Sequence, residues 1–227
     1  MADDYQKSEL TTEEDSLFDS EWDSFLTRHF REREVIDVYQ DHYDAIKETC
    51  RVAKYQLESI FGGVNARSNE FGWMPIMPQH LLATTIPTYA TKTWEQTITT
   101  TDVVTGSQAT PVPGWKDWIG TSASQLKVSK YGTLIIVGFH DPVDVPKIDG
   151  ILANIKSVGY PIWYFGSKMQ YTNYPIMELT TPIVVEKEQE FHLQEFCGRA
   201  GISKLRQLGV YFATGDHMRD RNAYAQI

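Results

Sequence analysis

The chain has 227 residues, of which 41% are hydrophobic and 12% aromatic, and this is enough apolar material for one substantial core. The net charge of −9 is unevenly placed, because residues 1–24 contain nine acidic side chains and one lysine while the other 203 residues sum to −1. Such a neutral body argues against nucleic-acid binding through bulk positive charge, although a local basic contact stays open. Two cysteines do not make a disulfide framework, and no apolar stretch approaches the roughly 20 residues of a membrane span.

The first predicted element is an acidic arm over residues 1–31. Its composition is typical of a segment that is disordered alone. Four apolar side chains can anchor it to a surface: Leu17, Phe18, Trp22 and Phe25. A solvated tail and a docked arm are therefore both open. Thr11 followed by Glu14 resembles a capping box, which predicts a helix beginning there.

The strongest pattern lies in residues 32–63, where apolar residues recur at alternating three- and four-residue steps. This spacing predicts one long amphipathic helix that ends near Gly62. The predicted assembly stripe consists of Ile36, Tyr39, Tyr43, Ile46, Cys50, Ala53, Leu57 and Ile60. Such a stripe can pack against the chain's own body or form a seam with another subunit, and both alternatives stay open.

Residues 64–227 are typical of a β domain, with Thr-, Val-, Ile- and aromatic-rich segments between prolines and glycines. Residues 65–90 are predicted to form a proline-rich connector, residues 106–120 an exposed loop, and residues 201–205 a turn or helical corner. Strands are predicted near residues 93–104, 125–130, 133–139, 183–186, 190–196 and 208–213. Proline followed by isoleucine at positions 161, 175 and 182 marks three strand starts. About eight short strands separated by turns are typical of a β-sandwich or a barrel, and the expected fold is a mainly antiparallel β-sandwich preceded by a long N-terminal α-helix.

One short helix is predicted inside the β domain, over residues 146–158. Pro146 suits a first helical turn, and Ile148, Ile151, Leu152 and Ile155 would share one apolar face.

The sequence contains no catalytic motif. Its six histidines lack the spacing of short metal-binding motifs, and its glycines match no phosphate-binding loop. We therefore predict no enzyme and no catalytic, cofactor-binding or metal-ligating residue. His140 with Asp141, and Asp216 with His217, follow predicted strand ends and are the residues that a loop-built hydrolase would use. Both cysteines, Cys50 and Cys197, are predicted to be small buried hydrophobes.

Two surface features are candidates for binding. Trp115 and Trp118 form a candidate ligand or partner surface, since aromatic planes stack on sugars. A C-terminal group of bases could instead meet the acidic arm of another copy, or form a solvated rim. This group consists of Arg199, Lys204, Arg206, Arg219 and Arg221, with Tyr224 beside them.

Residues 126–213 contain short strands and the passages Tyr174-Pro175-Ile176, Thr181-Pro182-Ile183-Val184-Val185 and Glu190-Phe191-His192-Leu193. This rhythm resembles the jelly-roll coat proteins of viruses, in which two antiparallel sheets form a wall block and terminal arms or helices join neighbours. The resemblance implies a jelly-roll sandwich and a self-assembling structural protein, a viral capsid or virion subunit. Its partners would be other copies of itself and other virion proteins.

That resemblance also implies that the protein assembles in the host cytoplasm and is then located in the virion. If it is not a virion protein, the expected location is the cytoplasm. The resemblance carries over no functional residue and no cofactor. A ligand- or carbohydrate-binding β-sandwich and, with less support, a metal-dependent hydrolase are the alternative functions.

Overall fold

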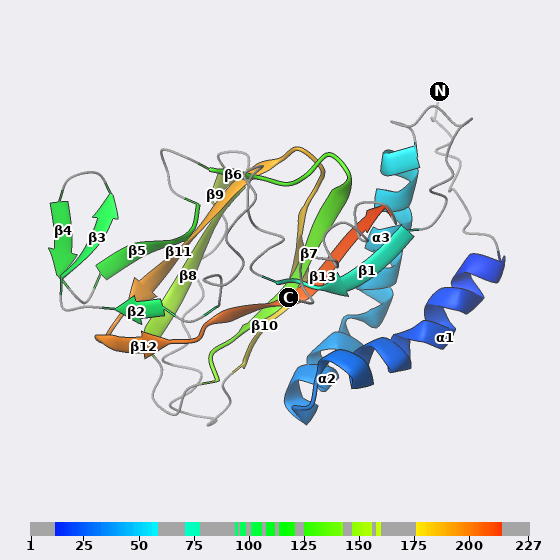
Figure 1. Cartoon of the computed structure of the whole chain (residues 1–227), viewed down its shortest axis with the longest axis horizontal. Helices are drawn as coiled ribbons and strands as arrows, with labels where there is room; N and C mark the ends of the chain where they lie inside the picture. Colours follow the sequence, from blue (N-terminus) through cyan, green and yellow to red (C-terminus); the bar gives the residue numbers. More distant parts are fainter. Residues whose placement is uncertain are drawn as a thin grey trace, which may run out of the picture.

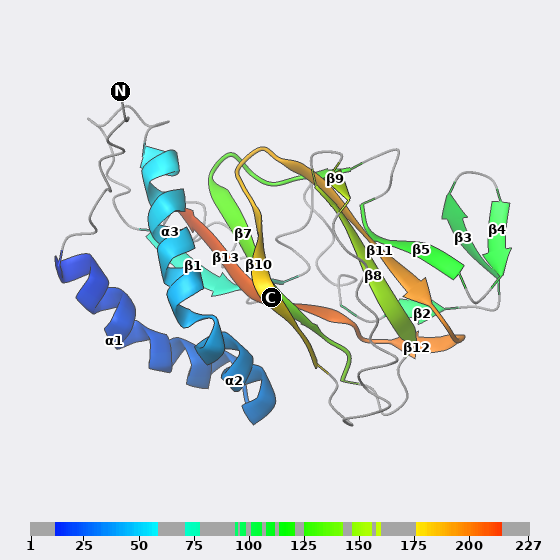
Figure 2. The same ribbon diagram turned by 180° about the vertical axis from the view of Figure 1, so that it is seen from behind.

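The computed structural model describes residues 12–58, 71–77, 94, 96–98, 101–105, 108–111, 114–120, 125–142, 147–155, 158–159 and 176–214. In this part of the chain, three helices lie on one side of a β-sheet and a second sheet lies on the other side (Figures 1 and 2). The molecule is therefore mainly β, with antiparallel strand pairs throughout the described sheets, as the sequence predicted.

The helices are α1 (Thr12–His29), α2 (Arg33–Asp41) and α3 (Tyr43–Glu58). Helix α1 confirms the helix expected from Thr11 onwards. The single long helix predicted for residues 32–63 is wrong, because α2 and α3 are separated at His42, where φ is −99° and ψ is 8°. One residue outside helical geometry leaves the apolar spacing intact, so the stripe could not reveal the break. Residues 59–63 lie outside the described part.

The first sheet has the strand order β1-β13-β7-β10, and the second has the order β5-β11-β8-β9 with β6 also paired to β11. The strands of the first sheet are β1 (Phe71–Pro75), β13 (Arg206–Thr214), β7 (Gly132–His140) and β10 (Ile176–Val185). Those of the second are β5 (Gly114–Ile119), β11 (Glu190–Cys197), β8 (Ile148–Ile155), β9 (Val158–Gly159) and β6 (Leu126–Lys127). Two small pairs complete the described strands: β12 (Gly201–Ser203) with β2 (Gln96–Ile98), and β3 (Thr101–Thr105) with β4 (Gln108–Pro111).

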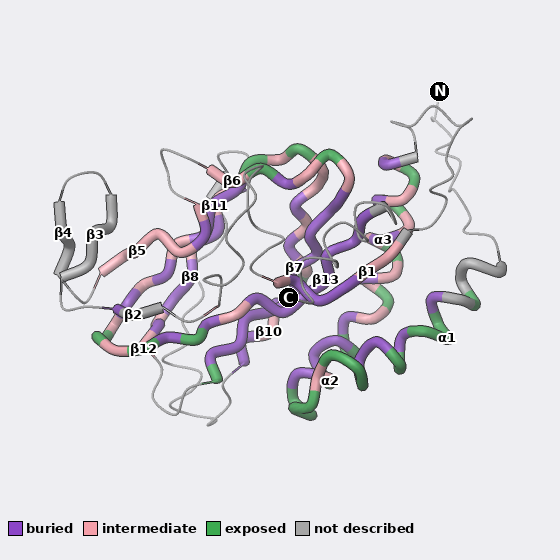
Figure 3. The backbone as a smooth tube through the Cα atoms, viewed as in Figure 1, coloured by how far each residue is buried: buried purple, intermediate pink, exposed green. Residues whose placement is uncertain are grey.

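Strand β7 lies at the centre of the three layers, and all nine of its residues are buried (Figure 3). Leu134 and Ile136 belong to the core between the two sheets, whereas Ile135 and Val137 belong to the cluster beneath the helices. A strand covered on both faces has no solvent side, so its sequence is an unbroken apolar run instead of an alternation.

The two sheets face one another across a shared core, as expected for a β-sandwich. Phe139 and Val185 enter this core from the first sheet, and Ile151, Phe191 and Leu193 enter it from the second.

The helix predicted for residues 146–158 is wrong, because residues 148–155 form strand β8. A β-bulge explains the error. The register between β8 and β11 shifts between Phe196 and Cys197, which pair with Gly150 and Ile148. The extra residue, Asp149, moves the inward positions by one, so Ile148 and Ile151 both face the core. The resulting three-residue spacing imitates one turn of a helix.

Two segments predicted as irregular also contain strands. Residues 106–120, predicted as a loop, include β4 and β5, and the connector at residues 65–90 includes β1. Residues 201–203 form β12 where a turn was predicted. Pro75 is tolerated because β1 is an edge strand, and Pro182 because β10 is also an edge strand whose register shifts between Glu178 and Ile183. The strand start after Pro175 is confirmed at Ile176, whereas residue 161 lies outside the described part.

Candidate functional site

The predicted assembly stripe lies against the chain's own sheet. Five of its residues are buried: Tyr39, Ile46, Cys50, Ala53 and Leu57. Ile36 and Tyr43 are half-buried in the same cluster, and Ile60 lies outside the described residues. On the sheet, the cluster includes Ile135, Val137, Val210 and Phe212. The intramolecular alternative therefore describes this face of the helices.

Helix α1 is docked by an aromatic cluster. Phe18, Trp22 and Phe25 are buried, and the Trp22 ring lies 5.3 Å from the Phe25 ring and 5.2 Å from the Tyr43 ring, measured between centroids. The docked-arm alternative thus describes residues 12–29, although Leu17 has no described side chain and residues 1–11 lie outside the described part. Asp19 adds a polar link to α3, because its carboxylate accepts hydrogen bonds from the Tyr43 hydroxyl and from Lys47 Nζ at 2.6 Å. These hydrogen bonds hold the pKa of Asp19 below its usual value.

Tyr39 anchors α2 to the middle of β13. Its hydroxyl donates to the Gly209 carbonyl at 2.9 Å and accepts from the Gly209 N–H at 2.8 Å. These backbone groups are available because the β13–β7 register shifts between Leu208 and Gly209. Burial raises the pKa of the Tyr39 hydroxyl, so it stays protonated and able to donate.

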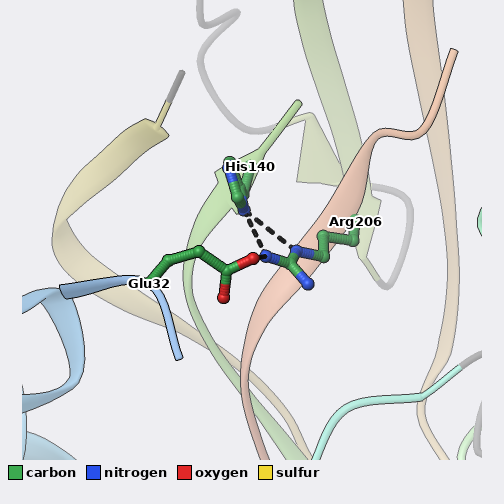
Figure 4. Close-up of polar contacts among 3 residues, drawn as sticks. All are labelled: Glu32, His140 and Arg206. Atoms are coloured by element: carbon green, nitrogen blue, oxygen red, sulfur yellow. Dashed lines mark hydrogen bonds and ion pairs between the residues drawn. The ribbon is translucent and has the colours of Figure 1, made fainter. Parts of the chain in front are cut away.

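The main polar contact between the helices and the sheet joins Glu32, Arg206 and His140, and we call these three residues the Glu32 clamp (Figure 4). Arg206 and His140 are directly opposed on β13 and β7. Arg206 Nε donates to His140 Nδ1 at 2.9 Å, Arg206 Nη2 lies 2.6 Å from the same nitrogen, and Nη2 also donates to Glu32 Oε1 at 3.2 Å. Glu32 is the residue just before α2, so the clamp fixes the start of that helix.

The geometry of the Glu32 clamp defines its charge state. His140 is buried, and its Nδ1 accepts from a guanidinium, so the imidazole is neutral. Burial and the adjacent Arg206 lower the pKa of His140 to about 4. Burial opposes the charge on Glu32, but backbone hydrogen bonds and Arg206 outweigh it, and the pKa of Glu32 is lowered.

The far end of α2 has its own polar contact with the sheet. His42 Nε2 lies 3.2 Å from Glu178 Oε1, and His42 is buried while the Glu178 side chain is 35% exposed. Helix α2 is therefore fastened to β13 and β7 at one end and to the edge strand β10 at the other.

Trp115 and Trp118 do not share a surface. Trp115 packs edge-on against Phe196 at 5.3 Å between centroids, whereas Trp118 packs against Phe139, in the core between the sheets, at 6.1 Å. The register of β5 shifts between Asp117 and Ile119, so the strand carries an extra residue there. On the same strand pair, Gln194 Nε2 donates to Asp117 Oδ1 at 2.9 Å. The side chains of Trp115, Phe196, Gln194 and Asp117 are all half-buried.

The hydrolase candidates are only partly described. His140 belongs to the Glu32 clamp and Asp141 is buried beside it, while Asp216 and His217 lie outside the described residues. Where the structure describes the chain, no group of three His, Cys, Asp or Glu side chains could hold a metal ion. The prediction that Cys50 and Cys197 are buried is confirmed, and burial raises the pKa of the Cys50 thiol.

A polar cleft of about 520 Å³ lies between the end of α3 and the turn from β10 to β11. It is lined by Gln56 and residues 186–190. Lys187 Nζ donates to the Gln56 carbonyl at 2.7 Å, which ties α3 to this turn. The turn contains Glu188, whose φ is 60°.

The C-terminal bases that the structure describes lie in different surroundings. Arg206 is engaged in the Glu32 clamp, Arg199 and Lys204 are exposed, and Arg219, Arg221 and Tyr224 lie outside the described residues. Within the described part, no helix is both long enough and apolar enough to cross a membrane.

Sequence reasoning named His140 and Arg206 separately but missed their contact with each other and with Glu32. The local sequence around each charge has no feature that identifies its partner. Gly209 did carry a signal, since an isolated glycine inside a strand pattern indicates a bulge or a close backbone approach.

No protein-family model, curated protein or solved structure matches this chain.

Proposed function

We propose that this protein is a self-assembling structural subunit with a jelly-roll body, forming part of a viral capsid or another virion structure. The strand pairing is the observation that carries the proposal. Eight strands form the main paths of the two sheets: β1, β5, β7, β8, β9, β10, β11 and β13. In chain order, the first pairs with the last, the second with the seventh, the third with the sixth, and the fourth with the fifth.

This nested antiparallel pairing supports a jelly roll, because it is what results when one long hairpin is rolled into two facing sheets. The strand order extends the likeness beyond residues 126–213, since β1 and β5 lie before them. Jelly rolls occur in capsid proteins, lectins and cupins, so the fold by itself leaves the function open.

The outer surface of α3 is evidence in favour of an assembling subunit and against a monomer. Val52 and Tyr55 are 48% and 61% exposed, and their three-residue spacing places them side by side on the helix. The opposite face of α3 is already occupied by the sheet, so a subunit contact would use this outer surface. Exposed aromatic and aliphatic neighbours are typical of protein contacts. The proposed partners are therefore other copies of this chain and other virion proteins.

Light scattering after size-exclusion chromatography, followed by negative-stain electron microscopy, tests the proposal. We expect an oligomer that grows with concentration and ends in particles of uniform shape. A monomer at every concentration and salt condition would contradict it.

A second candidate function is carbohydrate binding, which the surroundings of Trp115 favour. An aromatic pair with a neighbouring amide and carboxylate is a combination that can stack on a sugar ring and hydrogen-bond its hydroxyls. Glycan binding that is lost in Trp115→Ala and kept in Trp118→Phe would support this function. Absence of binding to a broad glycan array would count against it.

A further inference from the structure

Besides the Tyr39–Gly209 hydrogen bonds, three contacts between ionisable side chains help to hold the helices within the described part of the chain. The first joins α1 to α3 through Asp19 and Lys47, the second is the Glu32 clamp, and the third is the contact between His42 and Glu178. The Glu32 clamp differs from the others because it places a guanidinium directly on a buried imidazole. This arrangement requires the imidazole to accept a hydrogen bond.

Among the described residues, the groups that face His140 come from several elements. Strand β13 contributes Arg206, the residue before α2 contributes Glu32, and β7 itself contributes Asp141 as the next residue. On β10 the residue opposite His140 is Ile176, and Glu178, two residues further along, is paired with His42. Arg206 is therefore the charged group in direct contact with the imidazole.

We propose that acid releases the start of α2, and with it the end of α1, from the sheet, through protonation of His140. A protonated imidazole carries N–H groups on both nitrogens, so Nδ1 can no longer accept from Arg206. Two cations would then lie within 2.9 Å in a part-buried site, where their repulsion is less screened than in open water. Arg206 must move, and Glu32 loses its partner when it does.

The direction of the pH effect follows from the lowered pKa of His140. In the docked state its pKa is about 4, against the usual 6.5. Between these values a released His140 is protonated and a docked one is not, so docking weakens as the pH falls from 6.5 to 4.

The carboxylates of Glu32 and Asp19 act in the same direction. Their pKa values are lowered in the docked state, so the stabilisation they give is present above their ordinary pKa values and is lost as the pH falls through the lowered ones.

Hydrogen exchange measured by mass spectrometry on the full chain, from pH 7 to pH 3.5 with labelling times scaled to the intrinsic rate, tests this proposal. We expect peptides from α1 and from residues 30–34 to lose protection with a midpoint between pH 6.5 and 4. Peptides from β7 and β8 should keep their protection over that range. Simultaneous loss in the helices and both sheets would overturn the proposal, since it would mean global acid unfolding.

The decisive variant is His140→Gln, whose amide oxygen can accept from Arg206 but does not titrate in this range. We expect the α1 transition to disappear or to move below pH 4. His192→Gln is the matched control, because His192 is also buried but lies on β11 in the second sheet, and it should leave the α1 transition unchanged. An unchanged transition in His140→Gln would overturn the proposal.

A further variant covers the case in which His140→Gln does not fold. Glu32→Gln removes the charge that Arg206 holds, so α1 and residues 30–34 should be less protected than in the wild type already at pH 7. Equal protection would overturn the proposal. None of these measurements depends on assembly, so they can succeed or fail independently of the proposed function.

Discussion

The contact between Tyr39 and Gly209 depends on the absence of a side chain on β13. A Cβ atom at Gly209 would lie 2.0 Å from the Ile135 carbonyl oxygen, and the φ of 154° at this residue is one that other residues rarely adopt. Gly209 also accepts from the Ile76 N–H at 3.0 Å, so one residue links α2, β13 and the end of β1. An isolated glycine inside a strand pattern can indicate such a close approach, but it does not identify the partner, which lies 170 residues away.

Tyr39→Phe should lower the free energy of unfolding by about 1–3 kcal/mol, because it leaves the buried N–H of Gly209 without its acceptor. Urea denaturation followed by circular dichroism measures this change. Tyr55→Phe is the control, since Tyr55 is 61% exposed, and it should change stability by less than about 0.5 kcal/mol. Equal changes in the free energy of unfolding for the two substitutions would contradict a stabilising role of the Tyr39 hydroxyl.

At the scale of elements, the sequence predicted the β elements that lie in simple apolar runs or alternations. Strands β7, β11 and β13 were anticipated within a few residues, because each has an apolar run or alternation that matches its burial. Strand β8 was not anticipated, because the bulge at Asp149 changes the spacing of its core-facing residues from two residues to three. The break between α2 and α3 at His42 was not anticipated either, because it leaves the three- and four-residue spacing of the apolar residues unchanged.

The Glu32 clamp could not be predicted from any pattern. Its three members are separated in sequence, and each of them is ordinary in its local context: a charge before a helix, a histidine at a strand end, and an arginine at a strand start. They meet because β13 and β7 are neighbours and the residue just before α2 lies at the same end of that sheet (Figure 4).

Helix α1 is held largely by its aromatic residues, and Trp22→Ala should show this. Trp22 is 4% exposed and contacts the rings of Phe18, Phe25 and Tyr43, so its removal should cost about 3–5 kcal/mol. We expect increased proteolysis after Arg28 and Arg31 at neutral pH, with the sheets intact. Ser24→Ala, on the exposed side of the same helix, is the control. A Trp22→Ala protein as resistant as that control would contradict the docked arrangement of α1.

At the scale of the whole molecule, α1 and α2 are acidic, whereas α3 and the rest of the chain after α2 are neutral. Residues 12–41 contain ten acidic and three basic side chains, whereas residues 42–227 carry no net charge. Mutual repulsion between the acidic helices of neighbouring subunits would have to be relieved by salt or by a basic partner. Contacts through the outer surface of α3, which has balanced charge, avoid this repulsion.

Val52→Glu combined with Tyr55→Lys tests that surface. The double substitution replaces two exposed apolar side chains with opposite charges and adds no net charge, so we expect a monomer with unchanged thermal stability. Size-exclusion chromatography with light scattering is the measurement. Ser24→Glu with Thr27→Lys makes the same change of charge on the exposed side of α1 and should leave assembly intact. Wild-type assembly in the first variant would place the subunit contact elsewhere.

Strand β7 is the common wall of both apolar cores, with Leu134 and Ile136 on one side and Ile135 and Val137 on the other. Adjacent residues of this one strand therefore lie in different apolar cores of the molecule. Methyl resonances of Leu134 and Ile135 would give a built-in pair of spectroscopic reporters, one for the space between the sheets and one for the space under the helices. Loosening of either compartment could then be followed in the same sample without attaching a label.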